Sequence, residues 1–166
     1  TGMVIEGKAG FQIMGDWAKG EFTAAGKKPG VDYYCAATPS NNGYLYNVDS
    51  FIFYKTSDPD KQAGQKLLAK LMMGKNFQKV FNLYKGSIPA RLDVPMDEFD
   101  SCAKTSNADI KTAGAKGGLV PSFAHGMAQG NTMKAALQDV ITEHFNSNMS
   151  SVDAANALAD SVLQNM

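Results

Sequence analysis

The sequence predicts an α/β fold, because segments typical of strands alternate with segments typical of helices along its 166 residues. A short apolar run ends at Gly15, and longer helical patterns follow in the middle and near the end of the chain. The length is sufficient for one hydrophobic core, and a hydrophobic content of 44% is ordinary for a globular protein.

Three segments have the composition of strands. Residues 10–14 contain an apolar run that Gly15 interrupts, and Asp16 can then cap a helix that opens at Trp17. The aromatic and β-branched content of 31–37 and of 44–54 favours strands there as well. The turn-rich stretch between these two segments, 38–43, is expected to be a loop.

Four further helices are indicated by apolar residues at helical spacing. The first begins at Asp58-Pro59 and runs to Met73, and a second repeats the pattern after Gly74 up to Tyr84. A third covers 133–145. Ser150 is followed three residues later by an acidic residue, which is a capping signal for a last helix.

The charge pattern argues against a nucleic-acid partner. The chain has 16 basic and 16 acidic residues, so its formal net charge is zero, and no basic run interleaved with aromatic residues occurs. No apolar window approaches the length needed to span a bilayer, and no signal peptide is visible at the first residues.

Motifs for catalysis are absent from the sequence. There is no G-x-S-x-G elbow and no P-loop, and Gly114–Gly118 lacks the spacing of a dinucleotide fingerprint. Asp97, Glu98 and Asp100 form an acidic cluster, which is typical of a solvated face. Neither histidine has a partner at metal-ligand spacing. We therefore expect a protein that is not an enzyme and has no cofactor and no metal.

Four segments together resemble a known family. They are Glu6–Ala18, Tyr46–Phe51, Leu83–Arg91 and Gly118–Met127. In this order they are similar to the carboxyl-terminal part of glucose- and mannose-type sugar-binding proteins, the extracytoplasmic substrate-binding subunits of ABC transporters. The resemblance covers essentially the whole chain. Members of the family are considerably longer, and the counterpart of their first half is absent here.

The resemblance implies a two-lobed periplasmic-binding-protein fold of type II, of which this chain is the carboxyl-terminal half with parts of both lobes. Residues 1–45 and 107–166 would then belong to the carboxyl-terminal lobe, and 46–106 to the amino-terminal lobe. The chain would cross between the lobes near 44–49 and near 100–107.

The same resemblance implies a function in the periplasm. A monosaccharide, glucose first, would be captured by closure of the lobes and delivered to a permease, with no cofactor. Without its amino-terminal half the chain should bind sugar poorly and could self-associate through exposed edges. Two alternatives are a stand-alone interaction or scaffold module and a fragment of a carbohydrate-active enzyme.

The two cysteines, Cys35 and Cys102, match neither the C-x-x-C redox spacing nor a zinc ligand set. In a cytosolic protein they would be two reduced thiols. The periplasmic location implied by the resemblance favours a disulfide between them instead.

A sugar site needs an aromatic platform for the C–H face of the ring and polar groups for its hydroxyls. Trp17, the only tryptophan, could be that platform or a packed core residue. Asn47 offers a donor and an acceptor. Asp49 lies two residues further on the same side of the expected strand, but an aspartate near a strand end is as often a turn residue.

Lys85 and His125 complete the expected sugar contacts. Lys85 is at the end of a helical pattern, where a lysine also interacts favourably with the helix dipole in the absence of any ligand. His125 lies among small and apolar residues and could equally be a structural histidine. The resemblance favours a sugar-binding role for both. His144 is expected to be solvated, and Arg91 to form a surface ion pair.

Overall fold

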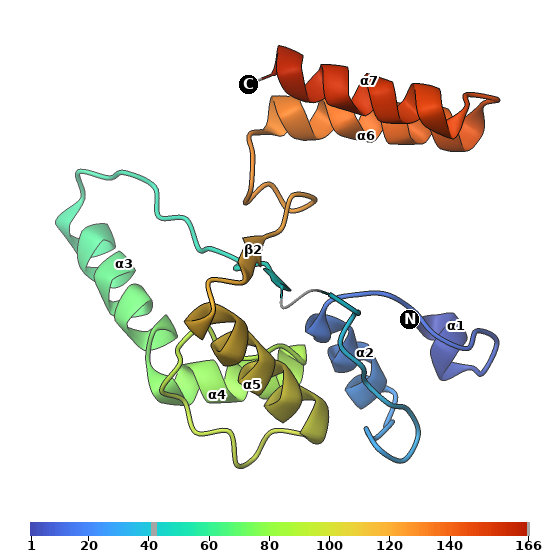
Figure 1. The fold of residues 1–166 in the computed structure, drawn as a ribbon. Helices are drawn as coiled ribbons and strands as arrows, with labels where there is room; N and C mark the ends of the chain where they lie inside the picture. Colours follow the sequence, from blue (N-terminus) through green and yellow to red (C-terminus); the bar gives the residue numbers. More distant parts are fainter. Residues whose placement is uncertain (41–42, 166) are drawn as a thin grey trace. The chain divides into compact units, whose positions relative to one another are not determined.

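The computed structural model describes residues 1–40 and 43–165. Within them the chain forms helices and one small sheet (Figure 1). The elements in chain order are α1 (Gly2–Ile5), the 3₁₀ helix η1 (Asp16–Ala18), α2 (Lys19–Ala24), β1 (Tyr44–Tyr46), α3 (Pro59–Met72), α4 (Lys75–Lys85), α5 (Ser101–Ala115), β2 (Leu119–Pro121), α6 (Asn131–Asn146) and α7 (Ser151–Gln164). Mixed helices with a small sheet are consistent with the predicted α/β class.

The chain divides into two compact units. Unit 1 comprises Thr1–Asn42 and Val48–Gly118, and unit 2 comprises Gly43–Asn47 and Leu119–Met166. The chain therefore leaves unit 1 for a short excursion into unit 2, returns, and ends in unit 2. The lobe boundaries expected from the sequence stay a prediction.

The helices expected after Asp58, after Gly74, around 133–145 and after Ser150 are all confirmed as α3, α4, α6 and α7. Ser150 caps α7, as expected, and Asp58 caps α3. The Asp58 side chain accepts from the backbone N–H groups of Asp60 and Lys61. The Ser150 side chain accepts from the backbone N–H of Asp153 and donates to its carboxylate at 2.6 Å.

Replacing Asp58 by alanine should lower the free energy of unfolding by about 1 kcal/mol, because two backbone donors of α3 lose their acceptor. Asp60→Ala is the matched control, since it removes an acidic residue from the same first turn without removing the cap, and it should cost a few tenths of a kcal/mol. Urea unfolding of the three proteins measures both values. Equal losses for the two variants would contradict the capping role of Asp58.

The predicted strands at 10–14 and 31–37 are wrong, and the strand predicted over 44–54 is reduced to three residues. A strand requires a neighbouring backbone for its hydrogen bonds. Tyr44–Tyr46 pairs with Leu119–Pro121. Among the described residues, 10–14 pair with no other strand, and 31–37 has only an isolated bridge between Tyr33 and Pro29. Phe11 and Ile13 are consequently exposed, at 81% and 79%. In the predicted 38–43 loop, residues 41 and 42 lie outside the described residues.

The start of the helix at Trp17 also differs from the expectation. Gly15 occupies the cap position, and the Asp16 side chain does not cap the helix. It accepts instead from the backbone N–H of Ile88, 72 residues away. This long-range contact provides the carboxylate with a partner that a local sequence pattern does not reveal.

Helix α5 was not expected, because its residues are mostly small and polar and lack a clear apolar stripe. Its N-cap is Asp100, whose side chain accepts from the backbone N–H of Ala103 at 2.8 Å. Ala103 is fully buried and packs with Val94 and Phe99 in the core of unit 1. A small residue on α5 thus allows the helix to approach the segment that precedes it.

Unit 2 combines the sheet with a helix pair. β1 and β2 are parallel, with Tyr44 opposite Leu119 and Tyr46 opposite Pro121. α6 and α7 pack side by side (Figure 1). Met133 of α6 and Ala154 of α7 are buried.

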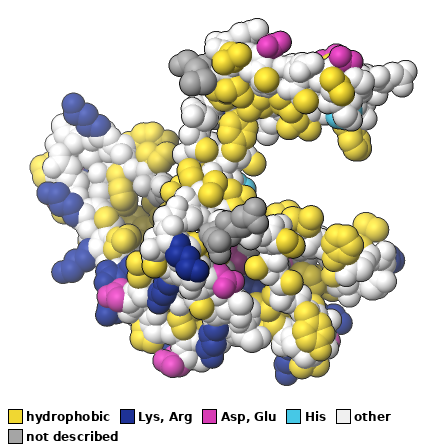
Figure 2. Space-filling view, in the orientation of Figure 1, with side chains coloured by type: hydrophobic (Ala, Val, Ile, Leu, Met, Phe, Trp, Pro, Cys, Tyr) yellow, Lys and Arg dark blue, Asp and Glu magenta, His cyan; other side chains and the backbone are white. Residues whose placement is uncertain are grey.

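Large hydrophobic side chains remain exposed in both units, as the yellow surface areas in Figure 2 show. In unit 1 they include several residues of α3 and α4. In unit 2 they include residues of α6 and α7. The clearest examples are Leu67, Leu71, Val80, Tyr84, Ile141, Phe145, Val152 and Leu163.

Candidate functional site

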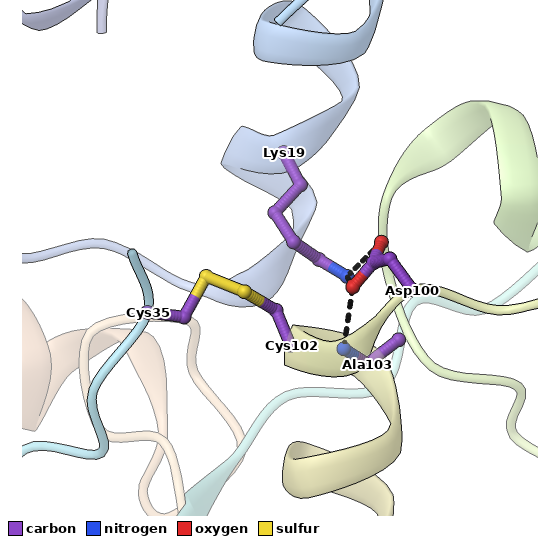
Figure 3. The surroundings of a disulfide bond; sticks show 5 residues. All are labelled: Lys19, Cys35, Asp100, Cys102 and Ala103. Atoms are coloured by element: carbon purple, nitrogen blue, oxygen red, sulfur yellow. Dashed lines mark hydrogen bonds and ion pairs between the residues drawn. A yellow bond between two sulfur atoms is a disulfide. The ribbon is translucent and has the colours of Figure 1, made fainter. Parts of the chain in front are cut away.

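A disulfide joins Cys35 to Cys102 in unit 1, as the resemblance implied, with a Cα–Cα distance of 5.7 Å (Figure 3). Cys102 is in the first turn of α5, beside the cap residue Asp100. The ammonium group of Lys19 on α2 donates to both oxygens of Asp100, at 3.0 and 3.1 Å. One covalent bond and one ion pair therefore attach α2 and the segment after it to the start of α5.

Lys85 is the last residue of α4, as predicted, and Gly86 caps the helix at φ +88°. The Lys85 ammonium forms an ion pair with the carboxylate of Asp49. It also lies 5.7 Å from the centre of the Phe81 ring, one helical turn earlier. Two of the predicted sugar-binding residues are thus in contact, and an aromatic ring adjoins them.

The indole of Trp17 lies directly against Gly15. A Cβ built on Gly15 would be 2.1 Å from Cζ3 of the ring, so the position of the indole requires a glycine there. Trp17 itself is half-buried. The ring is therefore packed against Gly15 on one side and only partly covered.

Asp16 connects the Trp17 turn to the segment after α4. Its Oδ2 accepts from the Ile88 N–H at 2.8 Å. Burial raises the pKa of the Asp16 carboxyl, while the hydrogen bond from Ile88 and the charges of Lys19 and Lys85 act in the opposite direction.

The two remaining predicted contacts, Asn47 and His125, belong to unit 2. Asn47 directly follows β1, and the Ser122 N–H directly after β2 donates to the Tyr46 carbonyl at 2.9 Å. Ser122 is buried, and its Oγ shares a hydrogen bond of 2.7 Å with Nδ1 of the exposed His125. Asn47 and His125 therefore follow the carboxyl ends of parallel strands, where α/β sheets commonly bind ligands.

The expected alternation that placed Asn47 and Asp49 on one strand face is wrong, because β1 ends at Tyr46. Asn47 and Asp49 instead belong to different units. Sequence reasoning also missed Phe81 beside Lys85 and Ser122 beside His125. The available signal was the short spacing of each pair: Phe81 is four residues before Lys85 on the same helix, and Ser122 is three residues before His125.

Several polar residues outside this set have structural partners. Arg91 pairs with Asp93 at 2.8 Å, as expected, and this hydrogen bond lowers the pKa of the Asp93 carboxyl. His144 was expected to be solvated, but it is half-buried and its Nδ1 is 2.9 Å from the Met149 carbonyl.

The acidic cluster is not the purely solvated face predicted from the sequence. Asp100 caps α5 and pairs with Lys19, whereas Glu98 pairs with Lys79 at 2.7 Å. A surface hollow of about 310 Å³ adjoins this second pair. None of the predicted sugar contacts lines it; its lining residues are Lys75, Asn76, Lys79, Pro95, Asp97 and Glu98.

In the described part of the chain, no cluster of three or more histidine, cysteine, aspartate or glutamate side chains is arranged to hold a metal ion. Among those same residues, no helix combines the length and the apolar character required to cross a membrane.

Comparison with known proteins gives a consistent set of relatives, although no protein-family model matches the chain. A "Probable sugar-binding periplasmic protein" of Brucella suis biovar 1 (strain 1330) is 48% identical over 163 residues, which are 98% of this chain and 38% of that protein. A protein of the same name from Rhizobium meliloti (strain 1021) is 44% identical over 98% of this chain and 39% of its own length.

A more distant relative is an uncharacterised ABC transporter extracellular-binding protein of Pyrococcus horikoshii, which is 35% identical over 98% of this chain and 36% of its own length. The chain thus spans less than two fifths of the length of these three relatives, or 36–39%. Over nearly its whole length it is homologous to one portion of proteins named for sugar binding in the periplasm.

Proposed function

We propose that this chain is the carboxyl-terminal part of a periplasmic sugar-binding protein that captures a monosaccharide, glucose first, and delivers it to the permease of an ABC importer. The observation that carries the proposal is the 44–48% identity, over 98% of the chain, to proteins named as sugar-binding periplasmic proteins. The disulfide between Cys35 and Cys102 supports an oxidising compartment.

The proposed sugar contacts are Trp17, Asn47, Lys85, His125 and, ranked lower, Asp49. The half-buried indole of Trp17 suits the C–H face of a sugar ring. The ion pair of Lys85 and Asp49 provides charged donors and acceptors for hydroxyl groups. Asn47 and His125 follow parallel strands, a usual position for ligand-binding groups.

Capture would proceed by closure of two lobes of type II architecture, to which this chain contributes only part. A closed form that binds sugar more tightly than the open form supplies the switch that the permease reads. The exposed hydrophobic residues of α3, α4, α6 and α7 support a larger protein in which the missing amino-terminal half covers part of them.

Lys85→Met in the intact protein is expected to weaken D-glucose binding about tenfold or more, because a charge-assisted hydrogen bond is lost while the aliphatic stem is kept. Isothermal titration calorimetry measures the change. Lys79→Met is the matched control, since Lys79 is on the same helix and is also paired with a carboxylate, that of Glu98. Equal affinity of Lys85→Met and the unmodified protein would remove Lys85 from the site.

His125→Ala is expected to weaken D-glucose binding at least several-fold, with His144→Ala as the control that removes the other histidine. His144 contacts the Met149 carbonyl between α6 and α7 and has no proposed role in binding. A loss of affinity in His144→Ala that equals the loss in His125→Ala would contradict a specific role for His125.

The isolated 166-residue chain should bind D-glucose weakly or not at all, because further contacts would come from the other half of the protein. A titration of this chain beside the intact protein tests the statement directly. Micromolar affinity of the isolated chain would show that the residues described here form a complete site.

A further inference from the structure

The contact between α2 and the end of α4 in unit 1 is unusually close, because it is made by two glycines. A Cβ on Gly20 would be 2.7 Å from the Lys85 carbonyl oxygen, and a Cβ on Gly86 would be 2.4 Å from the Gly20 nitrogen. Gly86 also has φ +88°, a backbone conformation that residues other than glycine rarely adopt. The backbone that carries Lys85 is therefore pressed against the helix that follows Trp17.

A hydrogen bond accompanies this steric contact. The Ile88 N–H, three residues after Lys85, donates at 2.8 Å to the carboxylate of Asp16, which directly precedes Trp17. Asp16 thus adjoins Trp17 in the chain and is hydrogen-bonded to the segment that follows Lys85. Its charge also lies within the electrostatic range of Lys85, which already pairs with Asp49.

We propose that Asp16 is a positioning residue of the sugar site: through its hydrogen bond to Ile88 it holds the Lys85–Ile88 segment against the Trp17 turn, so that indole and ammonium are presented in a fixed relation. This inference rests on the proposed sugar-binding role of Trp17 and Lys85. The sequence predicted a helix cap at Asp16, and Asp16 is not one of the proposed sugar contacts. The positioning role is therefore a separate assignment.

The test uses the intact protein with Asp16→Ala, Asp16→Asn, Lys85→Met and the double variant Asp16→Ala/Lys85→Met. Asparagine keeps an oxygen that can accept from the Ile88 N–H, whereas alanine does not. Asp58→Ala is the matched control, because it also removes a carboxylate that accepts from backbone N–H groups, but at the start of α3. Affinity is measured by calorimetry with whichever of D-glucose, D-mannose and D-galactose binds most tightly.

Asp16→Ala should weaken sugar binding about tenfold, whereas Asp16→Asn and Asp58→Ala should stay within about threefold of the unmodified protein. In the Lys85→Met background, Asp16→Ala should cost much less than in the unmodified protein, because it acts through Lys85. A general loss of stability would not produce this coupling. Hydrogen exchange of the segment containing Ile88 should accelerate in Asp16→Ala and stay slow in Asp16→Asn.

Unchanged affinity in Asp16→Ala, or losses that add fully in the double variant, would overturn the positioning role. Failure of the proposed function looks different. In that case Lys85→Met binds sugar as tightly as the unmodified protein, or no sugar binds, while exchange at Ile88 still accelerates in Asp16→Ala. That pair of results overturns the sugar site, and the positioning role with it, but leaves the contact between Asp16 and Ile88 intact.

Discussion

Replacing Cys35 and Cys102 together by serine is expected to lower the free energy of unfolding by about 4 kcal/mol in the chain-entropy account of disulfides. The bond links residues 67 positions apart, so its removal frees a long loop of the unfolded chain. In the folded protein it anchors Cys35, in a segment without regular secondary structure, to the first turn of α5. The effect should therefore be the largest of any substitution considered for unit 1.

Denaturant unfolding of the intact protein, with and without reductant, measures this loss. The serine variant should unfold at the same midpoint in both conditions, whereas the unmodified protein should shift to lower denaturant on reduction. Thiol titration of non-reduced protein under denaturing conditions is the control. Two titratable thiols, or an unfolding midpoint unaffected by reduction, would contradict the disulfide or its contribution.

Lys19→Met is expected to cost about 2–3 kcal/mol, somewhat less than a fully buried ion pair, because Asp100 keeps partial exposure to solvent. The Lys19 side chain is 7% exposed, and that of Asp100 is 32% exposed. Without Lys19, the carboxylate still accepts from the Ala103 N–H and lies at the favourable start of α5 (Figure 3). The remaining partly buried charge is the main source of the cost.

The surface pair of Lys79 and Glu98 provides the control for this measurement. Lys79→Met should cost less than about 1 kcal/mol, because Glu98 is 63% exposed and its charge stays hydrated. Adding Asp100→Asn to Lys19→Met should recover part of the loss, since the amide oxygen can still cap α5 without carrying a charge. Equal costs for Lys19→Met and Lys79→Met in urea unfolding would contradict this account.

Helices α3, α4, α6 and α7 could be predicted from the sequence, whereas α5 and most of the strands could not. For the strands, the reason lies in their hydrogen bonds. A helix such as α3 forms its backbone hydrogen bonds within one segment of the chain, and Asp58 and Pro59 mark its start in the sequence. A strand depends on a partner distant in the sequence. Residues 10–14 have the apolar composition of a strand, but composition carries no information on whether a partner backbone is present.

The predicted site residues were found through chemistry and family resemblance, but their neighbours depend on long-range packing. The ion pair of Lys85 with Asp49 joins residues 36 positions apart, and the contact of Asp16 with Ile88 joins residues 72 apart. No local pattern encodes such pairs. The contact between Gly15 and the Trp17 ring lies between local and long-range cases, because a glycine two residues before a tryptophan leaves room for the ring to pack over it.

The central proposal is that Trp17, Asn47, Lys85 and His125 contact one monosaccharide in the intact protein. A crystal structure of the intact protein with the bound sugar tests it most directly. We expect the Trp17 indole against the C–H face of the sugar, and Asn47, Lys85 and His125 within hydrogen-bond distance of its hydroxyls. Electron density for the sugar at a site away from these four side chains would contradict the account.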